Sequence, residues 1–169
     1  MRSFKSTIFK VYLWLPILAV IAVCLAAIYS PQAIQSGTLL AMVSAIISFV
    51  FFKQKQKLDE THLFKALFTE FNKRYKRINN DLNNIIRDKS NTELQPKQED
   101  ILFTYFNLCA EEYLYYKKGY IPKEVWDAWR KGISYYLKDS SVSKLWDKEE
   151  RETGESYYGL SRREIEKRT

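Results

Sequence analysis

The chain has 169 residues, a formal net charge of +7 and only two cysteines, Cys24 and Cys109. The expected topology places the first cysteine in a membrane and the second in the cytosol, which excludes a disulfide framework and a cysteine-based metal site. The positive charge gathers beside an uncharged stretch and forms no basic domain face, so duplex nucleic acid is not an expected partner.

The uncharged stretch runs from Val11 to Phe52 without any Asp, Glu, Lys, Arg or His. About 20 apolar residues suffice for a helix to cross a bilayer, so this length predicts two crossings. We predict a transmembrane helical hairpin with helices at 11–29 and 34–52 and an external loop at 30–33, where turn-forming residues cluster.

Basic residues flank the predicted hairpin on both sides. They are Arg2, Lys5 and Lys10 in the segment 1–10, and Lys53, Lys55 and Lys57 in a juncture at 53–60. Because Lys and Arg stay on the cytoplasmic side, we expect both termini in the cytosol and the bacterial inner (cytoplasmic) membrane as the location. A cleaved signal peptide is the alternative for the first run, but that run exceeds a signal core of about 7–15 residues and a second run follows it.

Small residues recur at four-residue spacing within both predicted crossings. They are Ala22, Ala26, Ala41, Ser44, Ala45 and Ser48. Such residues allow helices to approach closely in lipid. The pattern is consistent with packing inside one hairpin, or with a symmetric assembly of hairpins in which Ser44 and Ser48 face the partners.

Residues 61–169 are predicted to form one small all-α domain that binds a ligand or a partner. Apolar residues recur there at alternating spacings of four and three: Phe64, Phe68, Phe71, Tyr75, Ile78, Leu82 and Ile85. This heptad seam predicts a helix that can grow directly out of the second crossing. The spacing leaves open whether the seam packs within one subunit or between subunits.

Further helices are predicted from periodicity and end signals. One spans about 97–118 and stops at Gly119, and the next has Pro122 at its first position. A shorter segment covers 142–152, and a capping-box pattern at Ser161 predicts a last short helix.

Little in the chain indicates catalysis. His62 is the only histidine, and a metal site would need matched ligands. Glu111 and Glu112 are adjacent on a helix, so their side chains diverge by about 100°, and we expect them on a solvated face or paired with Lys. We therefore expect no catalytic residue, no metal, no cofactor and no enzyme activity.

Aromatic residues lie beside basic ones at several points of the predicted domain. Tyr and Trp suit interfaces and base stacking, so these positions favour a small anionic, base-bearing ligand, although each could be a core aromatic beside a solvated base. The candidate ligand residues are Arg74, Tyr75, Arg77, Tyr116, Lys117, Lys118, Trp129, Arg130, Tyr158, Arg162 and Arg163.

The uncharged hairpin, the basic juncture and a helical domain that contains the segment Tyr113 to Pro122 resemble poorly characterised bacterial two-crossing proteins. The layout is similar to that of membrane effectors of antiviral systems, including those of type III CRISPR, in which a cyclic oligoadenylate binds a cytosolic domain. The resemblance implies a homo-oligomer, because repeated subunits around an axis suit a symmetric cyclic ligand. It assigns no binding residue.

Two functions are therefore weighed. The first is a non-enzymatic membrane effector whose oligomeric helical domain binds a cyclic oligonucleotide and perturbs or gates the membrane part. The second is a constitutive membrane scaffold that holds a protein partner through its aromatic helices.

Overall fold

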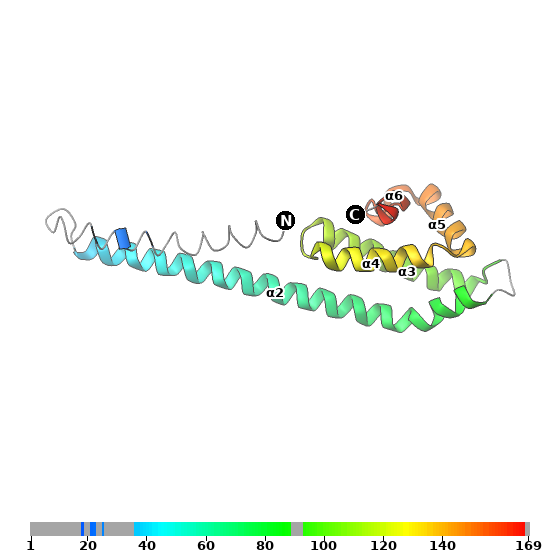
Figure 1. The fold of residues 1–169 in the computed structure, drawn as a ribbon, viewed down its shortest axis with the longest axis horizontal. Coiled ribbons are helices and arrows are strands. Elements are labelled where there is room, and N and C mark those ends of the chain that lie inside the picture. The colour runs from blue at the N-terminus through cyan, green and yellow to red at the C-terminus, as the bar shows by residue number, and fades with distance from the viewer. Residues whose placement is uncertain (1–17, 19–20, 23–24, 26–35, 89–92, 168–169) are drawn as a thin grey trace. The chain divides into compact units, whose positions relative to one another are not determined.

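The computed structural model describes residues 18, 21–22, 25, 36–88 and 93–167, and these form helices and turns without a strand. The all-α class is thereby confirmed. The loop at 30–33, Ala26 and nearly all of the first predicted crossing lie outside the described residues. The elements are α2 (Ser36–Arg87), α3 (Pro96–Lys117), α4 (Lys123–Tyr136), α5 (Ser140–Thr153), a 3-10 helix η1 (Gly154–Tyr157) and α6 (Arg162–Glu166) (Figure 1).

The chain divides into two compact units, Met1–Thr61 and His62–Thr169. The division falls next to the basic juncture predicted at 53–60. Helix α2 contributes residues to both units, because no helix-breaking residue separates the apolar run from the heptad seam.

In the first unit, α2 carries no charged residue from Ser36 to Phe52 and is largely apolar on all sides there. The stretch Leu39–Arg87 is, among the described residues, the one helix long and apolar enough to cross a membrane by length and composition. Large side chains such as Leu40 and Phe51 are 70% and 68% exposed, and Ala22, Ala41, Ser44, Ala45 and Ser48 are exposed as well. A helix that is hydrophobic on all sides suits lipid better than water.

The second unit has a continuous core to which every helix contributes. Along the heptad seam, Phe71, Leu82 and Ile85 are buried, and Phe64, Tyr75 and Ile78 pack against the same core. Phe68 is 40% exposed, and its ring stacks on Trp129 of α4. The seam therefore packs within one subunit, against α3 and α4 of the same chain.

Local end signals fix the boundaries of α3 and α4. Gly119 has φ +80°, its N–H donates to Tyr116 O, and the next N–H donates to Tyr115 O, which is the Schellman arrangement. Pro122 is the N-cap of α4, so the prediction that it occupies the first helical position is wrong by one residue. Its carbonyl accepts the first helical hydrogen bonds of α4 instead.

Side-chain caps begin the last two helices. The Asp139 carboxylate accepts hydrogen bonds from the N–H groups of Ser141 and Val142, so α5 begins two residues earlier than predicted. Ser161 Oγ accepts from the N–H of Glu164, as the capping pattern predicted for α6.

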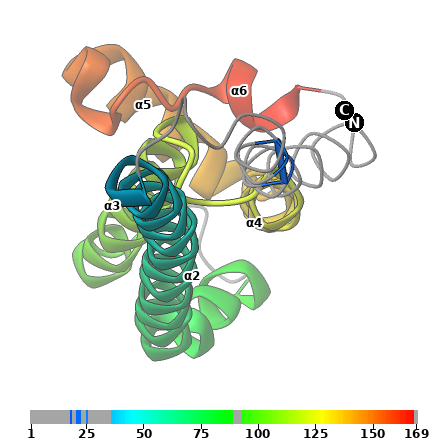
Figure 2. The ribbon, with the colours of Figure 1, turned by 90° about the vertical axis from the view of Figure 1, so that its left-hand side faces the viewer.

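Within the second unit, α3 and α4 form a middle layer. They pack on α2 through the ring contacts Phe71–Tyr115 and Phe71–Trp129. The segments α5, η1 and α6 cover the other side of this layer, where α3 contacts α5 and η1, and α4 contacts α6 (Figures 1 and 2).

Replacing Leu82, which is fully buried, should measure the contribution of the seam. We expect Leu82→Ala to lower the free energy of unfolding by about 2–5 kcal/mol, because it leaves a cavity in the core. Chemical denaturation of the full chain in detergent measures the loss. Leu63→Ala on the same helix, at a side chain 40% exposed, should change little. Equal losses for the two variants would contradict the burial of Leu82 in the core of the chain.

Candidate functional site

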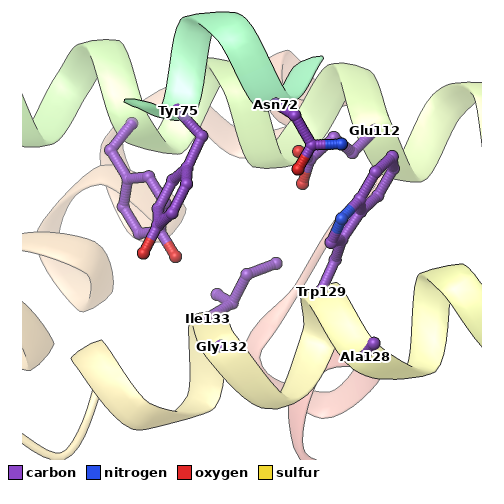
Figure 3. A pocket seen from close by; sticks show the side chains of 8 residues that line it. Asn72, Tyr75, Glu112, Ala128, Trp129, Gly132 and Ile133 are labelled. Atoms are coloured by element: carbon purple, nitrogen blue, oxygen red, sulfur yellow. The ribbon is translucent and has the colours of Figure 1, made fainter. Parts of the chain in front are cut away.

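A cavity of about 170 Å³ lies between α2, α3 and α4, and we call it the Glu112 cavity. Figure 3 shows Asn72, Glu112 and Trp129 toward one side of it, Tyr75 toward the other, and Gly132 and Ile133 on α4. Its lining consists of Asn72, Tyr75, Tyr105, Glu112, Ala128, Trp129, Gly132 and Ile133. Glu112 is the only ionisable carboxyl group among them.

Glu112 is only 6% exposed, so the expectation of a solvated or Lys-paired carboxylate is wrong for this residue. It follows Tyr105 and Cys109 at spacings of seven and three on α3, and both of those residues are buried. Burial raises the pKa of Glu112 to about 8, although the nearby Arg74 charge opposes the rise. The carboxyl is therefore mostly protonated at neutral pH.

Glu111, the neighbour of Glu112, forms an ion pair with Arg74. The guanidinium donates from Nη1 and Nη2 to the two carboxylate oxygens at 2.5 and 2.9 Å. This bidentate contact ties α2 to α3, and it raises the pKa of Arg74 further. The partner of Glu111 is thus an Arg and not the expected Lys.

Aromatic rings hold the other walls of the Glu112 cavity in place. The Trp129 ring stacks on Phe68 at 5.9 Å and meets Phe71 edge-on at 5.8 Å. The Tyr75 hydroxyl shares a 3.0 Å hydrogen bond with the Tyr136 hydroxyl. These contacts fix the rings before any ligand enters.

A second cavity, of about 200 Å³, lies between α3, α4 and the α6 segment, and we call it the Arg130 cavity. Its lining consists of Tyr116, Lys123, Trp126, Asp127, Arg130, Glu164 and Lys167. Three of these side chains are cationic and two are anionic, so the basic groups are in excess.

Arg130 is the buried cation of that cavity, with 7% of its surface exposed. It donates to the carbonyl of Lys167 and lies 3.5 Å from an Asp127 oxygen. Tyr116 stacks on Trp126 with the ring centroids 5.4 Å apart and the planes at 16°. The cavity therefore combines a flat aromatic surface with cationic groups.

The structure distributes the predicted ligand residues over several places. Arg74, Tyr75 and Trp129 lie at or beside the Glu112 cavity, whereas Tyr116 and Arg130 line the Arg130 cavity. The other six candidates line neither cavity. Arg77, Lys118 and Arg163 are exposed, and the remaining three are Lys117, Tyr158 and Arg162.

Lys117, Tyr158 and Arg162 contact other parts of the second unit. Lys117 Nζ donates to the Tyr158 carbonyl at 3.1 Å and lies over the Tyr113 ring. Arg162 joins α6 to α5 through Asp147 and Ser143.

Residues that the sequence-based candidates omitted complete both cavities. Glu112 is absent from the predicted ligand residues, although its spacing from the apolar residues of the buried face of α3 could be seen in the sequence. Lys123 and Trp126 lie one turn apart on α4 but seven and ten residues after Tyr116, so only the folded chain brings the three together.

No family model, curated protein or solved structure matches the chain. Within the described ranges, no three His, Cys, Asp or Glu side chains gather in a group that could hold a metal ion. The chemistry of the two cavities therefore carries the functional argument.

Stability should depend on pH through Glu112. Its pKa is raised from an ordinary 4.5 to about 8, so its stabilising contribution is complete below about pH 4.5, declines as the pH rises and is lost above about pH 8. Each pKa unit corresponds to about 1.4 kcal/mol, which makes several kcal/mol the upper bound. We expect Glu112→Gln to match the wild type near pH 4.5 and to melt at a higher temperature near pH 9.

Thermal unfolding of the full chain between pH 4.5 and 9 tests this expectation. The matched control is Glu152→Gln at an exposed position of α5. Equal pH profiles for the wild type and Glu112→Gln would show that Glu112 does not titrate in this window.

Proposed function

We propose that the protein is a non-enzymatic membrane effector of the bacterial cytoplasmic membrane. In this proposal the hairpin at 11–29 and 34–52 crosses the membrane twice, both termini are cytosolic, and the helical domain binds a small anionic ligand. The observation that carries the ligand class is the Arg130 cavity, where Tyr116 and Arg130 meet Lys123 and Lys167.

The groups in this cavity suit an anion that bears a ring. Lys123 Nζ lies 2.5 Å from Asp127 Oδ2, and the Lys123 side chain is 57% exposed. A phosphate can therefore bind the ammonium group in place of Asp127 or beside it. Lys167 is 69% exposed and lies 3.9 Å from Glu164. The outer part of Tyr116, which is only partly buried, offers a surface for stacking.

The size of the cavity favours one unit of a larger ligand. About 200 Å³ is below the roughly 300–1,000 Å³ of clefts that enclose drug-sized molecules. A cyclic oligonucleotide could place one nucleotide in each of several copies, and this would make the active form a homo-oligomer.

Helix α4 offers a route from the ligand to the membrane helix. Trp126 and Arg130 line the Arg130 cavity, while Trp129 of the same helix packs on Phe68 and Phe71 of α2. A ligand that prefers one position of α4 would therefore shift the equilibrium of α2, in proportion to its difference in affinity for the two states.

Binding can be tested with the full chain in detergent, using cyclic oligoadenylates and cyclic mononucleotides as probes. We expect one cyclic oligonucleotide to raise the melting temperature by mass action. Lys123→Gln and Lys167→Gln should each weaken its binding by about tenfold or more, because a charge-assisted hydrogen bond is worth about 1.5–3 kcal/mol. Lys138→Gln, at an exposed position outside both cavities, is the control.

Two results would count against the proposal. If no probe changes the melting temperature, the constitutive scaffold becomes the better hypothesis and protein partners should be sought. If a probe binds but the Lys123 and Lys167 variants bind it equally well, the ligand occupies another site.

The topology can be tested separately with reporter fusions in a bacterial host. Green fluorescent protein at the C-terminus should fluoresce, and alkaline phosphatase at the same place should be inactive, because the C-terminus is proposed to be cytosolic. Alkaline phosphatase inserted after Pro31 should be active. The reverse pattern would exclude the proposed orientation, and activity at both positions would indicate a single crossing.

A further inference from the structure

The Glu112 cavity has a distinct chemistry that the proposed function does not use. Its lining joins one buried carboxyl group to three aromatic rings, those of Tyr75, Tyr105 and Trp129, and to the amide of Asn72. The remaining lining residues are Ala128, Gly132 and Ile133. A buried carboxyl group that opens onto a cavity is an arrangement that folding stability alone does not favour.

The nearby charges leave this carboxyl group without a dedicated cation. Arg74 is the base whose charge acts on Glu112, but both of its terminal nitrogens donate to Glu111. Among the described residues, none of the ion pairs or hydrogen bonds involves the Glu112 carboxyl, which lines the cavity instead. An ionised Glu112 would therefore give the site a net negative charge.

We propose that the Glu112 cavity binds a small organic ammonium ion. The carboxylate supplies the opposite charge, and the faces or edges of Trp129, Tyr75 and Tyr105 surround the apolar part of the cation. Aromatic rings attract ammonium groups electrostatically, most strongly when water is excluded.

The dimensions and the entrance of the cavity agree with this ligand class. About 170 Å³ admits a compact amine, and no Lys or Arg lines the cavity to hold a phosphate, so the site is separate from the proposed anion site. Asn72, Ala128 and Gly132 line the cavity and are also exposed, so they mark its opening to solvent.

Proton linkage gives the proposal a specific signature. Burial raises the pKa of Glu112 to about 8, so the group is mostly protonated at pH 7 and must release its proton when a cation enters. Affinity for a permanent cation should therefore rise with pH up to about 8 and then level off. Up to one proton should be released per cation bound at pH 7.

The experiment is isothermal titration of the full chain in detergent with tetramethylammonium, whose charge does not change with pH. tert-Butanol, a neutral molecule of similar shape, is the matched probe, and micelles without protein are titrated as a blank. Repeating the titration in buffers with different ionisation enthalpies counts the released protons. We expect tetramethylammonium to bind at least tenfold more tightly than tert-butanol.

Two variants locate the site. Glu112→Gln removes the charge at nearly constant shape and should weaken tetramethylammonium binding at least tenfold and abolish proton release. Gly132→Leu should weaken it similarly by filling the cavity, because a Cβ at Gly132 meets no atom within 4 Å. Gly132→Ala and Glu152→Gln are the controls, and both should bind nearly as the wild type does.

Each outcome decides the proposal. Equal binding of the two probes, or tighter binding of tert-butanol, would show that the cavity takes a neutral ligand that accepts a hydrogen bond from protonated Glu112. Wild-type affinity in both Glu112→Gln and Gly132→Leu would place the cation elsewhere. No heat with either probe, for a protein with wild-type melting behaviour, would also overturn the proposal.

Discussion

The structure of the second unit depends on the burial of one stripe of α2 by α3 and α4. Phe71 and Leu82 lie at 3% and 0% exposure, and the ring contacts of Phe71 reach both covering helices. In the first unit, none of the described side chains of the apolar run of α2 is fully buried, and the run carries no charged residue up to Phe52. One helix thus contains two surface patterns: the first is long and apolar enough to cross a membrane, and the second is buried in a protein core.

Much of this fold was predictable because its signals are local. The heptad spacing identifies the buried stripe of α2, and the glycine at 119 ends α3 where only a residue tolerant of positive φ fits. The cap at Ser161 begins α6 for the same kind of reason. The error at Pro122 is one residue wide, because proline is compatible with both the N-cap and the first helical position.

The cavities were less predictable, because they arise where helices that are distant in sequence meet. From the sequence, Glu112 is predicted on a solvated face or paired with Lys, and carboxylates are indeed rarely buried without a partner. Glu112 lies seven residues after Tyr105 and three after Cys109, so helical periodicity places it on the same face of α3 as those two side chains. The folded chain buries all three. Arg130 was a candidate on the strength of the adjacent Trp129, yet the two side chains line different cavities.

The division of α4 between the two cavities gives the helix a structural role beyond covering α2. Trp126 and Arg130 lie one turn apart and line one cavity, whereas Trp129 and Ile133 lie one turn apart and line the other. Any displacement of α4 therefore changes both cavities at once. If each cavity holds its proposed ligand, the two binding free energies are coupled through α4, and thermodynamic linkage requires that coupling to be equal in both directions. Because Trp129 also packs on Phe68 and Phe71, the same displacement would change the packing of α2.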